Sequence, residues 1–474
     1  MTQNRSIQGA TATTAAATAG GARSRFTPAL LASLLLYAAI ALWLASHPVS
    51  LSSDDALFLL HALKRFSVLD FSPQFPGYPG LVALGRLALS ISHDPLDALG
   101  LTTLLVALAL PPMAGLVVWR VTGDRWRALL AFLLTLACPL LPDMALSLLS
   151  DGSGILFLLT FLSLLPRTSH EDLGFLQPFL AGAALAFAGV CRPSDAVLLA
   201  CALLGALIAL PRAWKALLAG GLAVTIPTLA VLFALEGTLY WQEGLRFFAG
   251  NAMLWGNTPF AGTSARHRNW LGAVASLPGG PVLIALPLIA ALAVLRRRRA
   301  PPAAFAAALA LPGHMVWILA FQNPDHLRHL APILILGGIL LATMKLPGAK
   351  SLTAIAASLY AIAAFWCMAL TLDPNPEHLP PLAQALSFLR AEPQAVVATN
   401  NGVFTLRTLL PRHHIYDMHY PADARLGLAM AKGPAYRLTT TRPENGNIVA
   451  AFPGRFAGEE TMWLERKRSP RPDL

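Results

Sequence analysis

Long apolar runs constrain the fold of this chain more than any other feature. Runs of roughly 20 residues recur along the first four-fifths of the 474-residue sequence, and a helix of that length crosses a bilayer. Only helices and closed barrels can do so, because backbone polar groups must be paired in lipid. The polar–apolar alternation of barrel strands is absent from this region. Charged residues make up 12% of the chain, about half the usual share of a soluble domain. The sequence therefore predicts a multi-span, all-α membrane domain.

The apolar windows predict about eleven membrane-spanning helices. Their approximate limits are 27–46, 96–118, 126–142, 153–166, 174–190, 195–210, 214–235, 271–295, 302–321, 330–344 and 351–371. The segment from Tyr78 to Ser92 is ambiguous. As a span it would place Arg120 and Arg125 outside, whereas as an interfacial or re-entrant helix it keeps them on the cytoplasmic side. Because cytoplasmic loops retain Lys and Arg, we adopt the second interpretation, with the N-terminus inside.

The net charge of +11 invites a nucleic-acid interpretation, but the placement of the charges argues against it. Basic residues lie mostly in short loops between the apolar runs, above all at Arg296–Arg299, as expected for topology anchors. The run could also bind anionic headgroups or RNA. We favour anchoring and expect membrane lipids, not nucleic acid, as partners. The four cysteines form no metal-type pair and predict neither a disulfide framework nor a zinc site.

The composition divides the chain into three parts. Residues 1–25 are rich in Ala, Thr and Gly and predict a disordered cytoplasmic tail. Residues 26–372 form the membrane domain, with an outer first loop at 47–95. Residues 373–474 begin with a Pro-rich link and then alternate short helical and strand patterns, which predicts a small α/β domain with some parallel pairing. On the adopted topology this domain is periplasmic and the protein is an inner-membrane protein of bacterial type.

The same topology gathers the unusual polar segments on the outer side. They are Asp54 and Asp55, the stretch Pro142–Gly154, the CRPSD segment, the loop Glu236–Trp270 and the QNPDHLRH segment. Acids beside a bilayer are costly unless something uses or solvates them. Convergence of these loops predicts a site at the outer membrane boundary.

Five short motifs in this order resemble the GT-C membrane glycosyltransferases, particularly the branch with the protein O-mannosyltransferases and the lipid A aminoarabinose transferase. They are Asp54-Asp55, FPGYPG at Phe75–Gly80, SDGSGILF, CRP at Cys191–Pro193 and RHLAP at Arg328–Pro332. The resemblance covers roughly residues 26–371. It implies a GT-C-like fold and transfer of a sugar from a polyprenyl-phosphate donor. The acceptor would be a lipid, lipopolysaccharide or protein at the periplasmic face, and the course would be inverting.

The first-loop acids are the candidate catalytic residues. Displacement of a phosphate at an anomeric carbon needs a base for the acceptor hydroxyl and cations for the leaving group. Asp54 or Asp55 matches the family's first-loop acid and is the candidate base. The sequence does not separate the two, although neighbours on a helix project about 100° apart. The alternative is an acid pair at the start of an interfacial helix, capped by Ser52 or Ser53.

The other candidates follow from the same motifs. Arg192 and Arg328 are predicted to bind the donor phosphate, since Arg offers a bidentate fit to phosphate. Tyr78, Asp151 and His326 are predicted to contact the sugar or acceptor. Each has a plainer alternative: a structural elbow for Tyr78, helix-end stabilisation for Asp151 and snorkelling to headgroups for Arg192.

No metal ligand is assigned. His326 and His329 have a spacing that would suit a metal on a helix face, but no third ligand is evident, and dependence on a divalent metal is left open. Two other functions stay open at this stage. One is a transporter or lipid flippase, although the charges lie at the edges of the spans and no internal repeat is evident. The other is a polymerase or ligase of surface polysaccharide, which would not require the first-loop acids.

Overall fold

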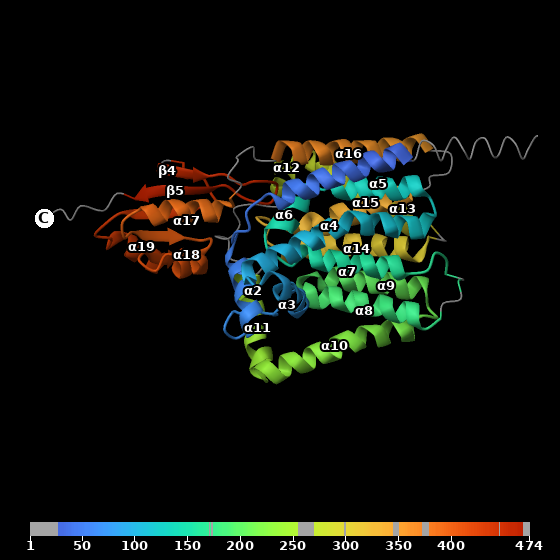
Figure 1. The fold of residues 1–474 in the computed structure, drawn as a ribbon, viewed down its shortest axis with the longest axis horizontal. Helices are drawn as coiled ribbons and strands as arrows, with labels where there is room; N and C mark the ends of the chain where they lie inside the picture. The colour runs from blue at the N-terminus through green and yellow to red at the C-terminus, as the bar shows by residue number, and fades with distance from the viewer. Residues whose placement is uncertain are drawn as a thin grey trace, which may run out of the picture.

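The structure is a computed structural model that describes residues 27–169, 171, 174–254, 270–297, 300–344, 350–371, 379–444 and 446–467. Figure 1 shows a bundle of helices lying side by side and, at one end of it, a small domain formed by the C-terminal part of the chain. The tail predicted at 1–25 lies outside the described residues, and so do residues 255–269 of the loop predicted between Glu236 and Trp270.

The part of the chain before residue 372 is mainly helical in its described residues. Its helices are Thr27–Ala45, α2 (Asp54–Lys64), α3 (Pro79–Ser92), α4 (Pro95–Thr122), α5 (Arg125–Leu136), α6 (Leu141–Leu146), α7 (Asp151–Leu164), α8 (Leu176–Cys191), η1 (Pro193–Asp195), α9 (Ala196–Ala209), α10 (Trp214–Glu236), α11 (Leu239–Leu254), α12 (Trp270–Ser276), α13 (Gly280–Leu295), α14 (Pro302–Phe321), η3 (Leu327–Leu330), α15 (Ala331–Thr343) and α16 (Lys350–Thr371).

Four of the described helices are long and apolar enough to cross a membrane: Thr27–Ala45, α4, α10 and α14. The number rises to six if each of two bent pairs forms one broken span, namely α8 with η1–α9 and α12 with α13, bent by 119° and 113°. Helix length therefore does not support the eleven spans predicted from the sequence. Apolar windows ignore helix breaks, and the window 126–142 divides into α5 and α6. The 14-residue α7 is only about 21 Å long, less than the hydrocarbon thickness.

The C-terminal part of the chain folds into a five-stranded mixed sheet with the order β2-β1-β3-β5-β4. Its strands and helices are α17 (Pro381–Ala391), β1 (Val396–Thr399), α18 (Val403–Leu409), β2 (His414–Asp417), α19 (Pro421–Ala429), β3 (Ala435–Thr439), β4 (Asn447–Phe452) and β5 (Met462–Lys467). Strand β1 pairs in parallel with β2 and β3, and β5 pairs antiparallel with β3 and β4. The expected alternation of helices and strands with parallel pairing is thus present.

The sheet domain packs against the end of the helix bundle through apolar side chains. The ring of Phe404, in α18, lies 5.2 Å from that of Phe58, in α2. Phe456 and Ala457, in the loop after β4, are 3% and 5% exposed and belong to the same apolar core as the bundle helices. The domain therefore covers the end of the bundle at which α2, α3 and α6 lie (Figure 1).

Two glycines let helices α8 and α10 approach each other closely. A Cβ atom at Gly182 would lie 1.9 Å from the carbonyl oxygen of Leu217, and one at Gly220 would lie 1.9 Å from the carbonyl oxygen of Phe179. Small residues at helix–helix contacts allow this backbone approach inside a membrane. The α8–α10 pair therefore depends on the missing side chains.

We predict that Gly220→Ala destabilises the bundle by about 1–3 kcal/mol, because an added methyl group forces the two backbones apart. The matched control is Gly221→Ala, at the next position of the same helix, where a Cβ would lie 3.8 Å from its nearest neighbour. The midpoints of unfolding of both variants in one detergent check the prediction. Equal midpoints would contradict it.

Candidate functional site

Helix α2 places the two first-loop acids on different sides. The helix begins at Asp54, and the Ser53 hydroxyl oxygen caps it by accepting a hydrogen bond from the Ala56 backbone N–H, 3.3 Å away. Both acids lie in the first turn, where the helix dipole favours negative charge. Because consecutive helical residues point about 100° apart, the two carboxylates meet different partners.

Asp54 joins the two parts of the protein. Its Oδ1 accepts hydrogen bonds from the backbone N–H and the hydroxyl of Thr405, both at 2.8 Å. Thr405 lies in the first turn of α18, whose own N-cap residue is Gly402 and has no side chain to serve that role. Asp54 therefore caps a helix of the sheet domain from the membrane domain. Burial raises the pKa of Asp54, and the hydrogen bonds from Thr405 oppose that rise.

Asp55 faces a cation. Its Oδ2 lies 3.5 Å from a terminal nitrogen of Arg328, and the Arg328 and Asp55 side chains are 18% and 42% exposed. Burial among the surrounding groups raises the pKa of Asp55, and the charges of Arg328 and Arg192 oppose that rise. Asp55 is thus a carboxylate that is open on one side and held by a cation on the other.

Behind Asp55 lies a buried network of charges. Arg192 contacts Asp151 with both terminal nitrogens, at 2.7 and 2.9 Å, and also donates to the Ser150 hydroxyl at 3.0 Å. Its Nε lies 3.5 Å from Asp195. Asp151, Arg192 and Asp195 are 3%, 7% and 3% exposed. The network ties the start of α7 to the break between α8 and α9.

A glycine makes room for this network. A Cβ atom at Gly154 would lie 2.9 Å from the Cβ of Arg192, so α7 must lack a side chain where Arg192 passes. Gly154 and Asp151 both belong to the SDGSG segment at Ser150–Gly154. Gly154 leaves space for the Arg192 side chain, and Asp151 forms an ion pair with it.

Arg328 links the buried network to Asp55. Its Nε lies 3.8 Å from Asp151 Oδ2, while a terminal nitrogen faces Asp55. The buried Nε–H has no hydrogen-bond acceptor within the part of the chain that the structure describes. A buried donor normally has a partner, so this guanidinium retains capacity for an additional acceptor. The space between the side chains of the network itself is too small for a water molecule, so a ligand would approach from the Asp55 side.

Tyr78 and His326 complete the surroundings of Asp55 and Arg328. Tyr78 follows the Pro76-Gly77 turn with a left-handed φ of 48°, a conformation that non-glycine residues seldom adopt. Burial, and then the negative charge of Asp55, raise the pKa of Tyr78 to about 12, so its hydroxyl stays protonated. Burial, and then Arg328 and Arg192, lower the pKa of His326 to about 3, so its imidazole is neutral at pH 7.

The structure also brings in residues that sequence reasoning did not select. Asp195 and Ser150 belong to the network, and Asp143, 5% exposed, lies in α6. A Cβ atom at Gly458, in the sheet domain, would lie 3.1 Å from Asp143 Oδ2. Burial raises the pKa of Asp143 to about 7, and the charge of Arg328 opposes that rise. An acid inside an apolar run is itself a signal of a functional site. Asp143 and Asp195 both lie in or beside such runs, so this signal could have selected them from the sequence.

No group of three or more His, Cys, Asp or Glu side chains among the described residues has an arrangement suited to a metal ion. His326 and His329 do lie near each other, with ring centroids 6.2 Å apart. The described residues therefore offer a cation for an anionic ligand, in Arg328, rather than a ready ligand set for a metal.

We predict that Arg192→Gln costs about 3–5 kcal/mol of stability, because it leaves Asp151 buried without its cation. The control is Arg65→Gln, which removes an ion pair with Asp70 of similar length, 3.0 Å, whose side chains are 82% and 56% exposed. An exposed pair contributes about 0–1 kcal/mol. Denaturant unfolding in mixed micelles compares the variants, and a similar loss in both would show that burial of the network does not matter.

The chain is similar in structure to solved glycosyltransferases. The structure of ArnT from Cupriavidus metallidurans bound to undecaprenyl phosphate matches with a TM-score of 0.51 and 12% identity, over 91% of this chain and 97% of that one. Its apo state gives 0.50 and 13%, over 92% and 98%. The oligosaccharyltransferase of Archaeoglobus fulgidus tethered to an acceptor peptide gives 0.50 and 13%, over 86% and 68%.

At these identities the likeness concerns the fold. No protein-family model and no curated protein sequence matches the chain. The two kinds of structural neighbour, ArnT and the oligosaccharyltransferase, are both GT-C glycosyltransferases, the class whose motifs the sequence resembles. The helical bundle with its C-terminal sheet domain therefore has a GT-C-like fold.

Proposed function

We propose that this protein is a membrane glycosyltransferase that moves a sugar from a polyprenyl-phosphate donor to a lipid, lipopolysaccharide or protein acceptor. The observation that carries the proposal is the pairing of Asp55 with Arg328 at 3.5 Å, on the open side of a buried charge network. It sets a base beside a cation, which are the two groups that displacement of an anomeric phosphate needs. The GT-C-like fold and the undecaprenyl phosphate bound to the similar ArnT structure support it.

In the proposed reaction Asp55 accepts the proton of the acceptor hydroxyl. The acceptor oxygen attacks the anomeric carbon while the bond from that carbon to the phosphate oxygen breaks. The electron pair leaves on the polyprenyl phosphate, whose added negative charge is stabilised by the partly exposed guanidinium of Arg328. One displacement at the anomeric carbon inverts its configuration.

The two arginines then have different tasks. Arg192 is buried and held by Asp151, Asp195 and Ser150, whereas the Arg328 side chain is 18% exposed and faces Asp55. We therefore assign the direct phosphate contact to Arg328 and give Arg192 the task of holding Asp151, which in turn lies 3.8 Å from Arg328. The neutral His326 and the protonated Tyr78 can donate or accept hydrogen bonds with sugar hydroxyls.

We place the site at the periplasmic face of an inner membrane, with the N-terminus in the cytoplasm. The support is the distribution of Lys and Arg between loops and the common end of the bundle at which α2, α3 and the sheet domain lie (Figure 1). Shorter apolar helices such as α7 and α15 run alongside the long ones, so we propose that they enter the bilayer too and bring the number of crossings toward eleven.

We expect Asp55→Asn to lower sugar transfer from a polyprenyl-phosphate donor about 10²–10⁴-fold, the usual contribution of a general base. Asp54→Asn should retain most of the rate, since that side chain holds Thr405 rather than facing Arg328. Radiolabelled transfer in membranes with matched expression measures both. Asp70→Asn, a change of an exposed acid in the same loop, is the control. Full activity of Asp55→Asn, or absence of any transfer by the unaltered protein, as for a transporter, would refute the proposal.

The pH profile should show the raised pKa of Asp55. Below its pKa the carboxyl is protonated and cannot accept a proton, so the rate should rise with pH and level off above a pKa higher than 3.8. Arg328→Gln removes a positive charge that lowers this pKa, so the rising limb should move to higher pH, on top of a lower maximal rate. Arg65→Gln should leave the limb in place. A shift to lower pH in Arg328→Gln would contradict the assignment.

A further inference from the structure

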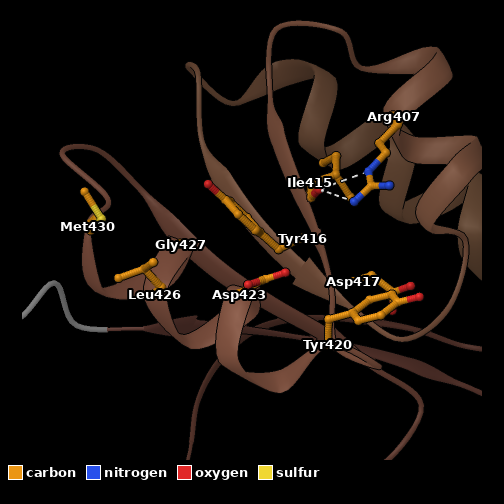
Figure 2. A pocket seen from close by; sticks show the side chains of 9 residues that line it. All are labelled: Arg407, Ile415, Tyr416, Asp417, Tyr420, Asp423, Leu426, Gly427 and Met430. Carbon is orange, nitrogen blue, oxygen red and sulfur yellow. Dashed lines mark hydrogen bonds between the residues drawn. The ribbon is translucent and has the colours of Figure 1, made fainter.

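The sheet domain carries a pocket that the proposed reaction does not use. It has a volume of about 350 Å³ and lies between strand β2, at one edge of the sheet, and helices α18 and α19. Figure 2 shows Asp417 and Tyr420 at one end, Leu426 and Met430 at the other, and Tyr416 and Asp423 between them. This size falls in the range of about 300–1,000 Å³ that small-molecule sites occupy.

One aromatic ring of the pocket is fixed by a glycine. A Cβ atom at Gly427 would lie 2.5 Å from the ring of Tyr416, so the ring lies directly on the bare backbone of α19. The second ring, Tyr420, is 66% exposed. A fixed aromatic ring and a second, exposed ring in one pocket suit a ligand that has apolar C–H faces and polar edges.

The polar groups of the pocket are mainly hydrogen-bond acceptors. Asp417 uses Oδ1 to accept from the backbone N–H and the imidazole of His419, and Asp423 is exposed in the first turn of α19. The one guanidinium that lines the pocket, Arg407, donates twice to the carbonyl oxygen of Ile415, at 3.1 and 3.0 Å (Figure 2). Two carboxylates beside an occupied cation favour a ligand rich in hydroxyl donors and disfavour an anion.

The pocket is linked to the reaction centre through one short helix. Thr405, which Asp54 holds, and Arg407, which lines the pocket, are both in α18. Asp54 is the chain neighbour of Asp55. A molecule bound in the pocket would therefore lie on the domain that covers the Asp55 end of the bundle.

We propose that this pocket binds a saccharide without acidic groups, which forms part of the acceptor. The ring face would pack on Tyr416 and Tyr420, and its hydroxyls would donate to Asp417 and Asp423. The acceptor role rests on the proposed glycosyltransferase function, while the saccharide site itself does not. The acceptor is then a glycoconjugate whose glycan is held by the sheet domain while its reacting hydroxyl extends to Asp55.

A peptide added to the edge of the sheet is the competing occupant. Strand β2 is an edge strand, but Arg407 already donates hydrogen bonds to the outward carbonyl oxygen of Ile415. The backbone N–H of Tyr420 donates a hydrogen bond to the backbone carbonyl oxygen of Asp417. With those acceptors used, the edge offers little of the ladder that an added strand requires, and the side-chain pocket is the better binding feature.

The test is saturation-transfer NMR on the full-length protein in nanodiscs. The probes are three neutral disaccharides, cellobiose, N,N′-diacetylchitobiose and mannobiose, with glucuronic acid as the acidic probe. We expect at least one neutral probe to bind with a Kd of about 1 mM or tighter and the acidic probe to bind more weakly. Tyr420→Ala and Asp423→Asn should each weaken binding about fivefold or more, through loss of a ring face and of a charged acceptor. Tyr420→Phe should keep most of the affinity.

Two further variants separate this inference from the proposed reaction. Arg425→Gln alters an exposed residue of α19 outside the pocket and should bind the probes normally, as should the Asp55→Asn protein. Binding that persists in a protein without transferase activity would sustain the pocket and refute only the reaction. Absence of binding by every neutral probe, equal binding by Tyr420→Ala, or stronger binding of the acidic probe would overturn the saccharide site even if transfer activity is present.

Discussion

The Asp151–Arg192 ion pair is the interaction on which the rest of the site depends. Both side chains are nearly buried and meet through two contacts of 2.7 and 2.9 Å. Charges removed from water are costly unless paired and hydrogen-bonded, and here Ser150 and Asp195 complete the arginine's partners. The pair fixes the start of α7 against the α8–α9 break, and it sets a negative charge behind Arg328. That charge holds the Arg328 guanidinium where it can face Asp55.

Helix geometry directs the adjacent side chains of Asp54 and Asp55 toward different partners. Asp54 caps a helix of the sheet domain through Thr405, and Asp55 faces Arg328. The angular step of a helix makes this division unavoidable once Ser53 starts α2. As a result, docking of the sheet domain and the proposed chemistry are coupled through a single peptide unit. Asp143, buried in α6 beside Gly458 of the sheet domain, is a second acid at the boundary between the same two parts.

The charged residues of the site lie at one end of the helix bundle. Helix α2, which carries Asp55, lies at the end of the bundle that the sheet domain covers, and not along its length (Figure 1). In the proposed reaction the leaving phosphate of the lipid carrier would stay at the membrane surface, and its prenyl chain would stay in the hydrocarbon. A cation at the end of the bundle, with an open carboxylate beside it, would suit that proposed donor because it would meet both environments.

The sequence by itself determined the membrane class, the helical bundle, the C-terminal α/β domain and the segments that carry the site, because apolar periodicity and misplaced acids are local signals. It selected Asp55, Asp151, Arg192 and Arg328 as candidates, which the structure brings together, and the five strands lie in the region where an α/β domain was expected. It overestimated the spans supported by helix length, since apolar windows do not register breaks such as that between α5 and α6. Only the tertiary structure separated Asp54 from Asp55, added Asp195 and Asp143, and formed the pocket at Tyr416, because each of these depends on side chains that distant segments bring together.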